Sequence, residues 1–186
     1  MSTQAAALPR LAGPRVSLVP VDRDLARAVV QDPASAAAAL HVLGLVPGRG
    51  WPHDGTGDAL RPLAEHGEPG DGSASWLVCV GTEVVGDCGW RGRPDADGTV
   101  ELGYGLAVPS RGRGTGTEAV ALLAAWAEQQ PGVRLLTAEV LVGNEASVRL
   151  LHRLGFVEQG SNAPYLRLVR PGPGARRGHV RGRHVC

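Results

Sequence analysis

The feature that most constrains the fold is an alternating strand that runs through a Gly-Arg loop into a helix. In residues 99–106 (TVELGYGL), apolar side chains share one face, while Glu101 shares the other face with two glycines. The loop that follows reads RGRGTGT over residues 111–117. Apolar positions then recur at helical spacing over residues 119–126, and a Pro-Gly pair ends the pattern. This segment therefore predicts a strand, a glycine-rich turn and an amphipathic helix in direct succession.

The glycine-rich turn is a candidate anion site. Glycines leave backbone N–H groups unshielded, and the N-terminus of the following helix adds partial positive charge. Together they favour a phosphate group, to which Arg111 and Arg113 can add charge-assisted hydrogen bonds. The loop is not a Walker A motif, because GK[ST] is absent, and it is not GxGxxG, because Thr117 stands where the third glycine belongs. On the loop alone, an ordinary flexible loop is an equal alternative.

Strands and helices are predicted on both sides of this unit. Alternating or apolar runs predict strands over residues 15–21, 75–80, 83–90, 133–142, 156–160 and 164–170, the second and third joined as a hairpin. Helical patterns are predicted over residues 22–32, 34–44, 59–67 and 145–154. Asn144 is the expected N-cap of the last helix, and Gly155 is its expected C′ glycine.

Composition narrows the class of protein. The 186 residues suffice for one domain with a sizeable core, and the net charge of +1 does not indicate binding to nucleic acid or an acidic membrane. All 19 basic residues are Arg. Three cysteines without a CxxC give no disulfide framework, and the histidines show no metal-ligand spacing, so no metal site is predicted. No signal peptide or membrane-length apolar run is evident, and a cytoplasmic protein is expected.

The two ends of the chain are expected to differ from its body. Residues 1–14 are small and contain proline, and we expect a flexible lead-in. Residues 171–186 hold four Arg and two His without apolar periodicity, which predicts a disordered basic tail. The folded domain is therefore expected over residues 15–170.

Several motifs in order resemble one superfamily. Residues 111–116 match the pattern [Q/R]-x-x-G-x-[G/A], and NEASVRLLHRLGF follows over residues 144–156. This set resembles the GNAT superfamily of acetyl-CoA-dependent N-acetyltransferases, and most closely its ribosomal-protein N-terminal acetyltransferase branch. The resemblance is close from Trp76 to about Gly160, and WPHD at residues 51–54 is similar less specifically. It implies the acyl-CoA N-acyltransferase fold: one α/β domain with a twisted, mixed, mostly antiparallel sheet of about seven strands, flanked by helices.

The resemblance also implies how acetyl-CoA would be bound. The strand before the loop is expected to splay from its neighbour, so that pantetheine inserts like an extra strand against backbone groups of Leu106, Ala107 and Val108. The pyrophosphate would be held by backbone N–H groups of Arg111, Gly112, Arg113, Gly114, Thr115 and Gly116. Thr117 would add a hydroxyl, and Asn144 would line the lower part of the site.

The resemblance also implies catalytic roles, and at one of these positions this chain departs from the family pattern. Glu101 is the favoured base, because it shares a face with glycines that leave room for ligand, and Glu139 is the second choice; a solvent-facing carboxylate is the alternative for Glu101. A backbone N–H near Ala107 or Val108 would meet the oxyanion. Many members carry an acid Tyr where this chain has Leu151, and neither of its two tyrosines matches that position. Ser147 or water is then the expected acid.

The expected function is transfer of an acetyl group from acetyl-CoA to a primary amine, either a small molecule or a protein N-terminus, by direct attack in a ternary complex. One alternative is a CoA-binding module that senses or recruits without catalysis. Another is an aminoglycoside-type acetyltransferase. A nucleic-acid-binding tail is a further, less favoured reading, and a homodimer is expected only because dimers are common in the family.

Overall fold

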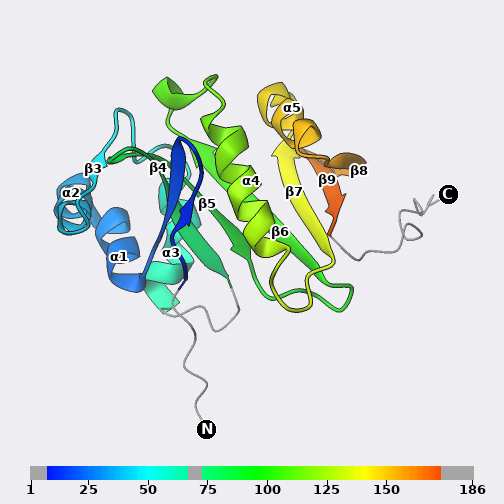
Figure 1. Ribbon diagram of the computed structural model, residues 1–186, viewed down its shortest axis with the longest axis horizontal. Coiled ribbons are helices and arrows are strands. Elements are labelled where there is room, and N and C mark those ends of the chain that lie inside the picture. The colour runs from blue at the N-terminus through cyan, green and yellow to red at the C-terminus, as the bar shows by residue number, and fades with distance from the viewer. Residues whose placement is uncertain (1–7, 67–72, 173–186) are drawn as a thin grey trace, which may run out of the picture.

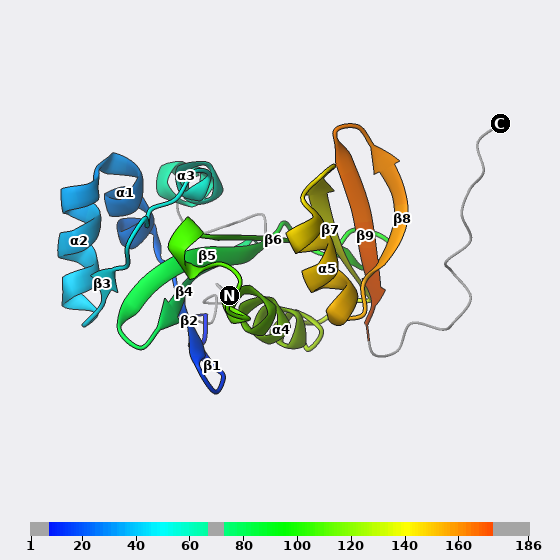
Figure 2. The ribbon, with the colours of Figure 1, turned by 90° about the horizontal axis from the view of Figure 1, so that it is seen from above.

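The computed structural model describes residues 8–66 and 73–172, which form a central sheet with helices on both faces (Figures 1 and 2). The strands are β1 (Leu11–Ala12), β2 (Val16–Pro20), β3 (Val46–Pro47), β4 (Ala74–Val80), β5 (Glu83–Arg91), β6 (Thr99–Leu106), β7 (Leu135–Leu141), β8 (Val157–Asn162) and β9 (Tyr165–Pro171). The helices are α1 (Arg23–Gln31), α2 (Pro33–Val42), α3 (Thr56–His66), α4 (Thr115–Ala127) and α5 (Glu145–Arg153), with a short 3-10 turn at Val108–Ser110.

The sheet confirms the predicted class and corrects the strand count. Its order is β1-β2-β4-β5-β6-β7-β9-β8, with β3 beside β5, and all pairs are antiparallel except β6–β7 and β3–β5. Nine strands are present among the described residues, against about seven predicted. The two additions, β1 and β3, have two residues each and no alternation from which they could be predicted.

Two hydrophobic cores cover the two faces of the sheet. One core packs α4 and α5 against the sheet, and its centre is Trp76, whose ring meets that of Trp126 edge-on at 4.7 Å. The other packs α1, α2 and α3 against the opposite face around Leu77. Figure 2 shows the three early helices and α4 on opposite sides of the sheet. Because side chains of a strand alternate between faces, neighbouring Trp76 and Leu77 belong to different cores.

The sheet is split in its middle, between β6 and β7. These strands pair only over Thr99–Glu101 and Leu135–Thr137, whereas β7 continues to pair with β9 up to Leu141. On its other side, β6 stays paired with β5 as far as Leu106. The second half of β6 therefore has one open edge, which confirms the predicted splay.

A polar clamp joins the two halves at the closed end of this split. The Arg170 guanidinium of β9 donates two hydrogen bonds to Glu128 Oε1, at 3.0 and 2.6 Å, just after α4. It donates a third to the Leu154 carbonyl at the end of α5 (3.0 Å) and lies over the Phe156 ring, 5.8 Å from its centroid. Arg170 thus connects both helices that border the split to the strand behind them.

The ends of the domain differ from their predicted bounds. The Pro9 carbonyl accepts a hydrogen bond from Trp76 Nε1 at 2.9 Å, and β1 pairs with β2, so part of the expected lead-in belongs to the sheet. Pro171 ends β9, and the Gly172 N–H donates to the Arg134 carbonyl. Residues 1–7 and the rest of the predicted basic tail, 173–186, lie outside the described residues.

Candidate active site

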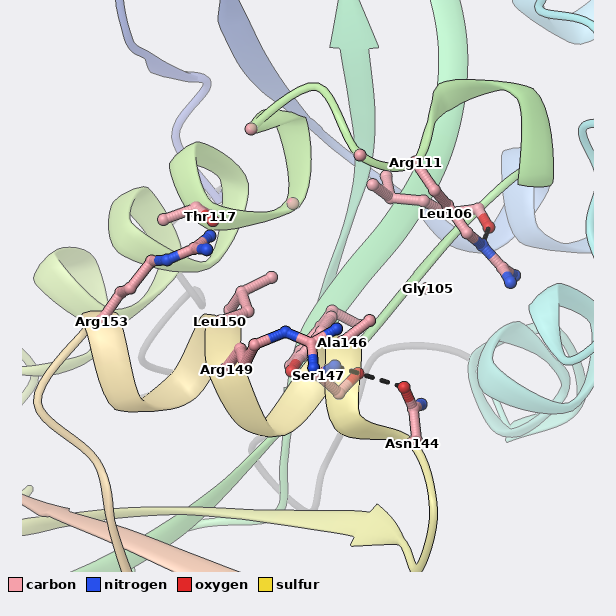
Figure 3. Close-up of a pocket in the computed structure, with 14 residues that line it drawn as sticks. Gly105, Leu106, Arg111, Thr117, Asn144, Ala146, Ser147, Arg149, Leu150 and Arg153 are labelled. Carbon is pink, nitrogen blue, oxygen red and sulfur yellow. Dashed lines mark hydrogen bonds between the residues drawn. The ribbon is translucent and has the colours of Figure 1, made fainter.

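A cleft of about 400 Å³ opens where β6 leaves β7 (Figure 3). Three segments line it: the end of β6, the Gly-Arg loop with the first turn of α4, and one face of α5. The lining residues are Tyr104, Gly105, Leu106, Arg111, Gly112, Gly114, Gly116, Thr117, Asn144, Ala146, Ser147, Arg149, Leu150 and Arg153. Eight of the predicted site residues are therefore brought together, while Ala107, Val108, Arg113, Thr115 and Glu101 are outside the lining.

The register of β6 decides which backbone groups face the cleft. The Ala107 N–H donates to the Val85 carbonyl at 2.9 Å. Because orientation alternates along an antiparallel pair, Gly105 also points its N–H and C=O toward β5. The N–H and C=O of Tyr104 and Leu106 consequently point the other way, toward the open edge. An extended ligand could pair with these groups as a strand would.

This geometry differs from the prediction for Ala107 and Val108. Ala107 is fully buried and uses its N–H inside the sheet, so it offers the cleft no backbone donor. Val108 is 70% exposed and lies beyond the lining. Leu106 does line the cleft, and its carbonyl accepts a hydrogen bond from Arg111 Nε at 2.9 Å. Tyr104, for which the sequence predicted no role in the site, is the second residue whose backbone N–H and C=O face the open edge.

The Gly-Arg loop leaves the N-terminus of α4 uncapped. Its N-cap is Gly114 with φ +79°, and no side chain in the described residues accepts from the first turn. Gly112 also has a positive φ of +75°, which glycine adopts without steric cost. A Cβ at Gly116 would stand 3.1 Å from Leu150 Cδ1, so glycine there lets α4 approach α5. The free N–H groups and the helix dipole fit an anion.

One face of α5 supplies two further cations. Ala146, Arg149, Leu150 and Arg153 follow the helical repeat and line the cleft, while Leu151 faces the core. Arg149 pairs with Glu145 at 2.8 Å, whereas Arg153 has no ionic or hydrogen-bond partner within the described chain. Figure 3 shows Arg153 extending from α5 toward Thr117 of α4. With Arg111, three guanidinium groups surround the cleft, which favours a ligand with several negative charges.

The start of α5 holds Asn144 and Ser147 as predicted for a capped helix. Asn144 Oδ1 accepts a hydrogen bond from the Ser147 N–H at 3.2 Å, so Asn144 is the N-cap. Both residues also line the cleft. The capping role and a binding role are therefore compatible for Asn144. Gly155 has φ +82°, as its predicted C′ position requires.

Tyr104 brings a buried phenol to the cleft. Tyr104 and Ser147 both line the cleft, and Tyr104 Oη is buried with no hydrogen-bond partner among the described residues. Burial raises the pKa of Tyr104, an effect that the Ser147 hydroxyl partly opposes. The phenol is therefore protonated at neutral pH and available as a donor.

The opposite face of β6 carries Glu101, whose surroundings are different. Glu101 is 37% exposed and lies 3.8 Å from Arg91 on the neighbouring strand. A Cβ at Gly103 would meet nothing within 4 Å, as the prediction of open space there requires. At Gly105, however, a Cβ would overlap the His53 ring, so this glycine makes room for His53 rather than for a ligand. Glu139 is exposed on β7 and outside the cleft.

His53 belongs to a buried polar group that sequence reasoning missed. Its Nε2 lies 3.0 Å from Asp87 Oδ2, a close ion pair without the alignment of a hydrogen bond, and Nδ1 is 2.7 Å from the Asp54 carbonyl. Thr56 Oγ1 donates to the same Asp87 oxygen at 2.7 Å. Asp87 raises the pKa of His53, against the opposing effect of burial. These contacts fix the WPHD segment onto β5 and β6.

The described residues hold neither a metal-binding cluster nor a membrane-spanning helix. In residues 8–66 and 73–172, no group of three or more His, Cys, Asp or Glu side chains is arranged to hold a metal ion. Over the same ranges, no helix combines the length and apolar character needed to cross a membrane.

Comparisons with known proteins agree with this geometry. The chain is 29% identical to the uncharacterized N-acetyltransferase YjdG of Bacillus subtilis (strain 168), over 68% of this chain and 79% of that protein. Its fold is similar to ribosomal-protein-S5-alanine acetyltransferase from Vibrio fischeri, with a TM-score of 0.62, 15% identity and coverage of 91% and 100% of the two chains. It is also similar to Mycobacterium smegmatis RimJ in complex with CoA-disulfide, with a TM-score of 0.57, 23% identity and coverage of 88% and 86%.

The family itself is shown by a longer match. Residues 15–157 match the model of the acetyltransferase (GNAT) domain, which is most of the chain. That span contains β6 and β7, between which the sheet splits, together with the Gly-Arg loop and α5. The chain therefore belongs to the GNAT acetyltransferase family, and the predicted acetyl-CoA-dependent N-acetyltransferase is confirmed.

Proposed function

We propose that the protein transfers the acetyl group of acetyl-CoA directly to a neutral primary amine, a small molecule or a peptide N-terminus, in one ternary complex. The observation that supports this most is the cleft itself. An open strand edge, an uncapped helix N-terminus and three guanidinium groups converge on one volume of about 400 Å³. The edge suits the amide-bearing pantetheine, and the cationic end suits the phosphates.

Specific residues would hold acetyl-CoA in this arrangement. Backbone groups of Tyr104 and the Leu106 carbonyl would pair with pantetheine, because they face the open edge. N–H groups from Gly112 to Gly116 would hold the pyrophosphate, with Thr117, Arg111 and Arg153 around it. Asn144 would line the lower part of the cleft. Thr115 would contribute through its backbone alone, because its side chain is buried.

Acetyl-CoA supplies an electrophilic thioester carbonyl and a thiolate leaving group. The chain must then take a proton from the amine and stabilise the oxyanion. We assign the first task to Glu101, acting through water, because it is partly exposed and lies beside the open space at Gly103. We assign the second to the Leu106 N–H, which replaces Ala107 as donor because the latter is bonded to Val85.

His53 is the second candidate for the base. It lies over Gly105, two residues beyond Gly103 on the face of β6 that carries Glu101. Glu101 and His53 therefore lie on either side of the open space at Gly103. Both of its ring nitrogens already have close partners, which favours a positioning role for it.

The acceptor is expected to carry few positive charges. The segment before α3 presents Asp54, and the first turn of α3 presents Asp58, as exposed carboxylates, and the described residues there hold no dense acidic patch. A polycationic drug would need more carboxylates for complementary binding. This supports a small amine or a peptide N-terminus over an aminoglycoside.

Calorimetric titration tests the proposal in two steps. Acetyl-CoA and CoA should bind, ATP should bind more weakly, and Gly114→Glu should abolish binding by placing a carboxylate at the phosphate site. Gly81→Glu is the matched control, because Gly81 also has a positive φ but lies in the β4–β5 turn, where a Cβ would meet nothing within 4 Å. A screen of amines then follows, with Glu101→Gln expected to lower kcat by about 100-fold. Binding without turnover of any amine would instead identify a CoA-sensing module.

A further inference from the structure

The Tyr104 hydroxyl is a buried polar atom whose role the fold does not explain. Tyr104 lies on β6 three residues beyond Glu101, the last β6 residue paired with β7. Its Oη is shielded from solvent and finds no hydrogen-bond partner in the described chain. Buried hydroxyls in native proteins almost always have partners, and exceptions tend to mark functional positions. The same residue lines the cleft.

No other phenol can serve the cleft. The chain contains two tyrosines, and the second, Tyr165, is 41% exposed on β9, outside the lining. On α5, Leu151 is fully buried in the core and has no polar atom. Ser147, one turn earlier on α5, also lines the cleft and carries a hydroxyl. Tyr104 and Ser147 are thus the hydroxyl-bearing residues that β6 and α5 contribute to the lining.

We propose that the Tyr104 O–H donates a hydrogen bond to the thioester sulfur and stabilises the charge that develops there as the C–S bond breaks. This inference rests on the proposed function. The amine nitrogen forms a bond to the acetyl carbon, and the C–S bond breaks with its electron pair passing to sulfur. The amine proton goes to the base or to water, and the thiolate takes a proton from solvent after it leaves. Tyr104 keeps its own proton throughout.

The acidities of the two groups agree with a donor that is not consumed. A thiol titrates at roughly 8.5 and an ordinary phenol near 10. Burial raises the pKa of Tyr104 further, so the phenol holds its proton more tightly than the departing thiol would. A hydrogen bond to an ionised acceptor is stronger than one between neutral groups, so this contact strengthens as the thiolate forms. It therefore favours the transition state over bound substrate.

The test uses CoA binding, which does not require an acceptor amine. In wild-type protein, the dissociation constant of CoA should fall by about 10-fold between pH 7 and pH 9.5, because the donor favours the thiolate. In Tyr104→Phe this gain should be lost, while the affinity for acetyl-CoA at pH 7 stays within about 2-fold. Tyr165→Phe is the matched control and should behave as wild type. Desulfo-CoA, which lacks the sulfur, should show no difference among the three proteins.

A second measurement guards against a misfolded variant. Incorporating 3-fluorotyrosine into the Tyr165→Phe protein modifies Tyr104 alone, because the chain has only two tyrosines. The more acidic phenol should then increase the thiolate preference above that of unmodified protein. Equal pH dependence of CoA binding in wild type and Tyr104→Phe would overturn the inference while leaving the proposed function intact. If folded wild-type protein bound neither acetyl-CoA nor CoA, both would fail.

Discussion

Replacing Arg170 with Met should destabilise the domain by about 2–3 kcal/mol. Arg170 makes three hydrogen bonds, two to Glu128 and one to the Leu154 carbonyl, and covers the Phe156 ring. Its side chain is 22% exposed and that of Glu128 15% exposed. Breaking a fully buried ion pair costs about 3–5 kcal/mol, and partial solvent access reduces that figure here. Met preserves the hydrophobic contact with Phe156, so the loss reports mainly the polar bonds.

Urea denaturation would measure this loss directly. The melting temperature should also fall, by roughly 4–12 °C for a chain of this length. Arg167→Met is the matched control, because Arg167 is exposed on the same strand and should change stability by less than about 0.5 kcal/mol. In a double-mutant cycle, Glu128→Gln should lose most of its effect once Arg170 is gone. If Arg170→Met unfolds at the same urea concentration as Arg167→Met, the clamp contributes no stability and the reasoning is refuted.

Two further predictions concern the cleft and its opposite face. Arg153→Gln should weaken CoA binding by about 10-fold in calorimetry, and Arg149→Gln by less, because Glu145 already neutralises Arg149 in part; equal losses would contradict this ranking. The raised pKa of His53 implies stability that is fully present below about pH 6.5 and is lost as pH rises through its folded pKa. His53→Gln should therefore reduce the loss of unfolding free energy as pH rises above about 6.5. An unchanged dependence of unfolding free energy on pH would show that the Asp87 contact does not couple to folding.

The sequence predicted those strands, helices and caps that are determined by residues close together in the chain. Residues 99–106 alternate without interruption, and the observed strand has those bounds. Asn144 and Gly155 bracket α5 because a cap and a C′ glycine act within a few residues of the helix they end. The turn from the Gly-Arg loop into α4 was predicted because the glycines and the helix are contiguous in sequence, and its phosphate-binding role stays a prediction.

The missed features depend on contacts between distant segments. His53 and Asp87 are 34 positions apart and meet only after α3 has packed beside β5. Gly105 was interpreted as room for ligand, whereas the side chain that fills it comes from the WPHD segment. Ala107 was assigned to pantetheine by the resemblance to the GNAT family, whereas its backbone bond to Val85 depends on the register with β5. Arg153 was overlooked because the sequence does not show that its face of α5 borders a cleft, which forms only where α4 and its preceding loop lie opposite.

The open half of β6 matters most when the enzyme is idle. β6 is an interior strand, yet beyond Glu101 its free side presents main-chain donors and acceptors to any extended peptide that reaches them. Proteins protect such edges because they template pairing with foreign chains. Bound acetyl-CoA would occupy this edge, and each tenfold rise in its concentration above Kd would add about 1.4 kcal/mol to the stability of the fold. The cosubstrate would thereby act as the missing strand of its own enzyme, and a cell short of acetyl-CoA would hold this protein in its most aggregation-prone form.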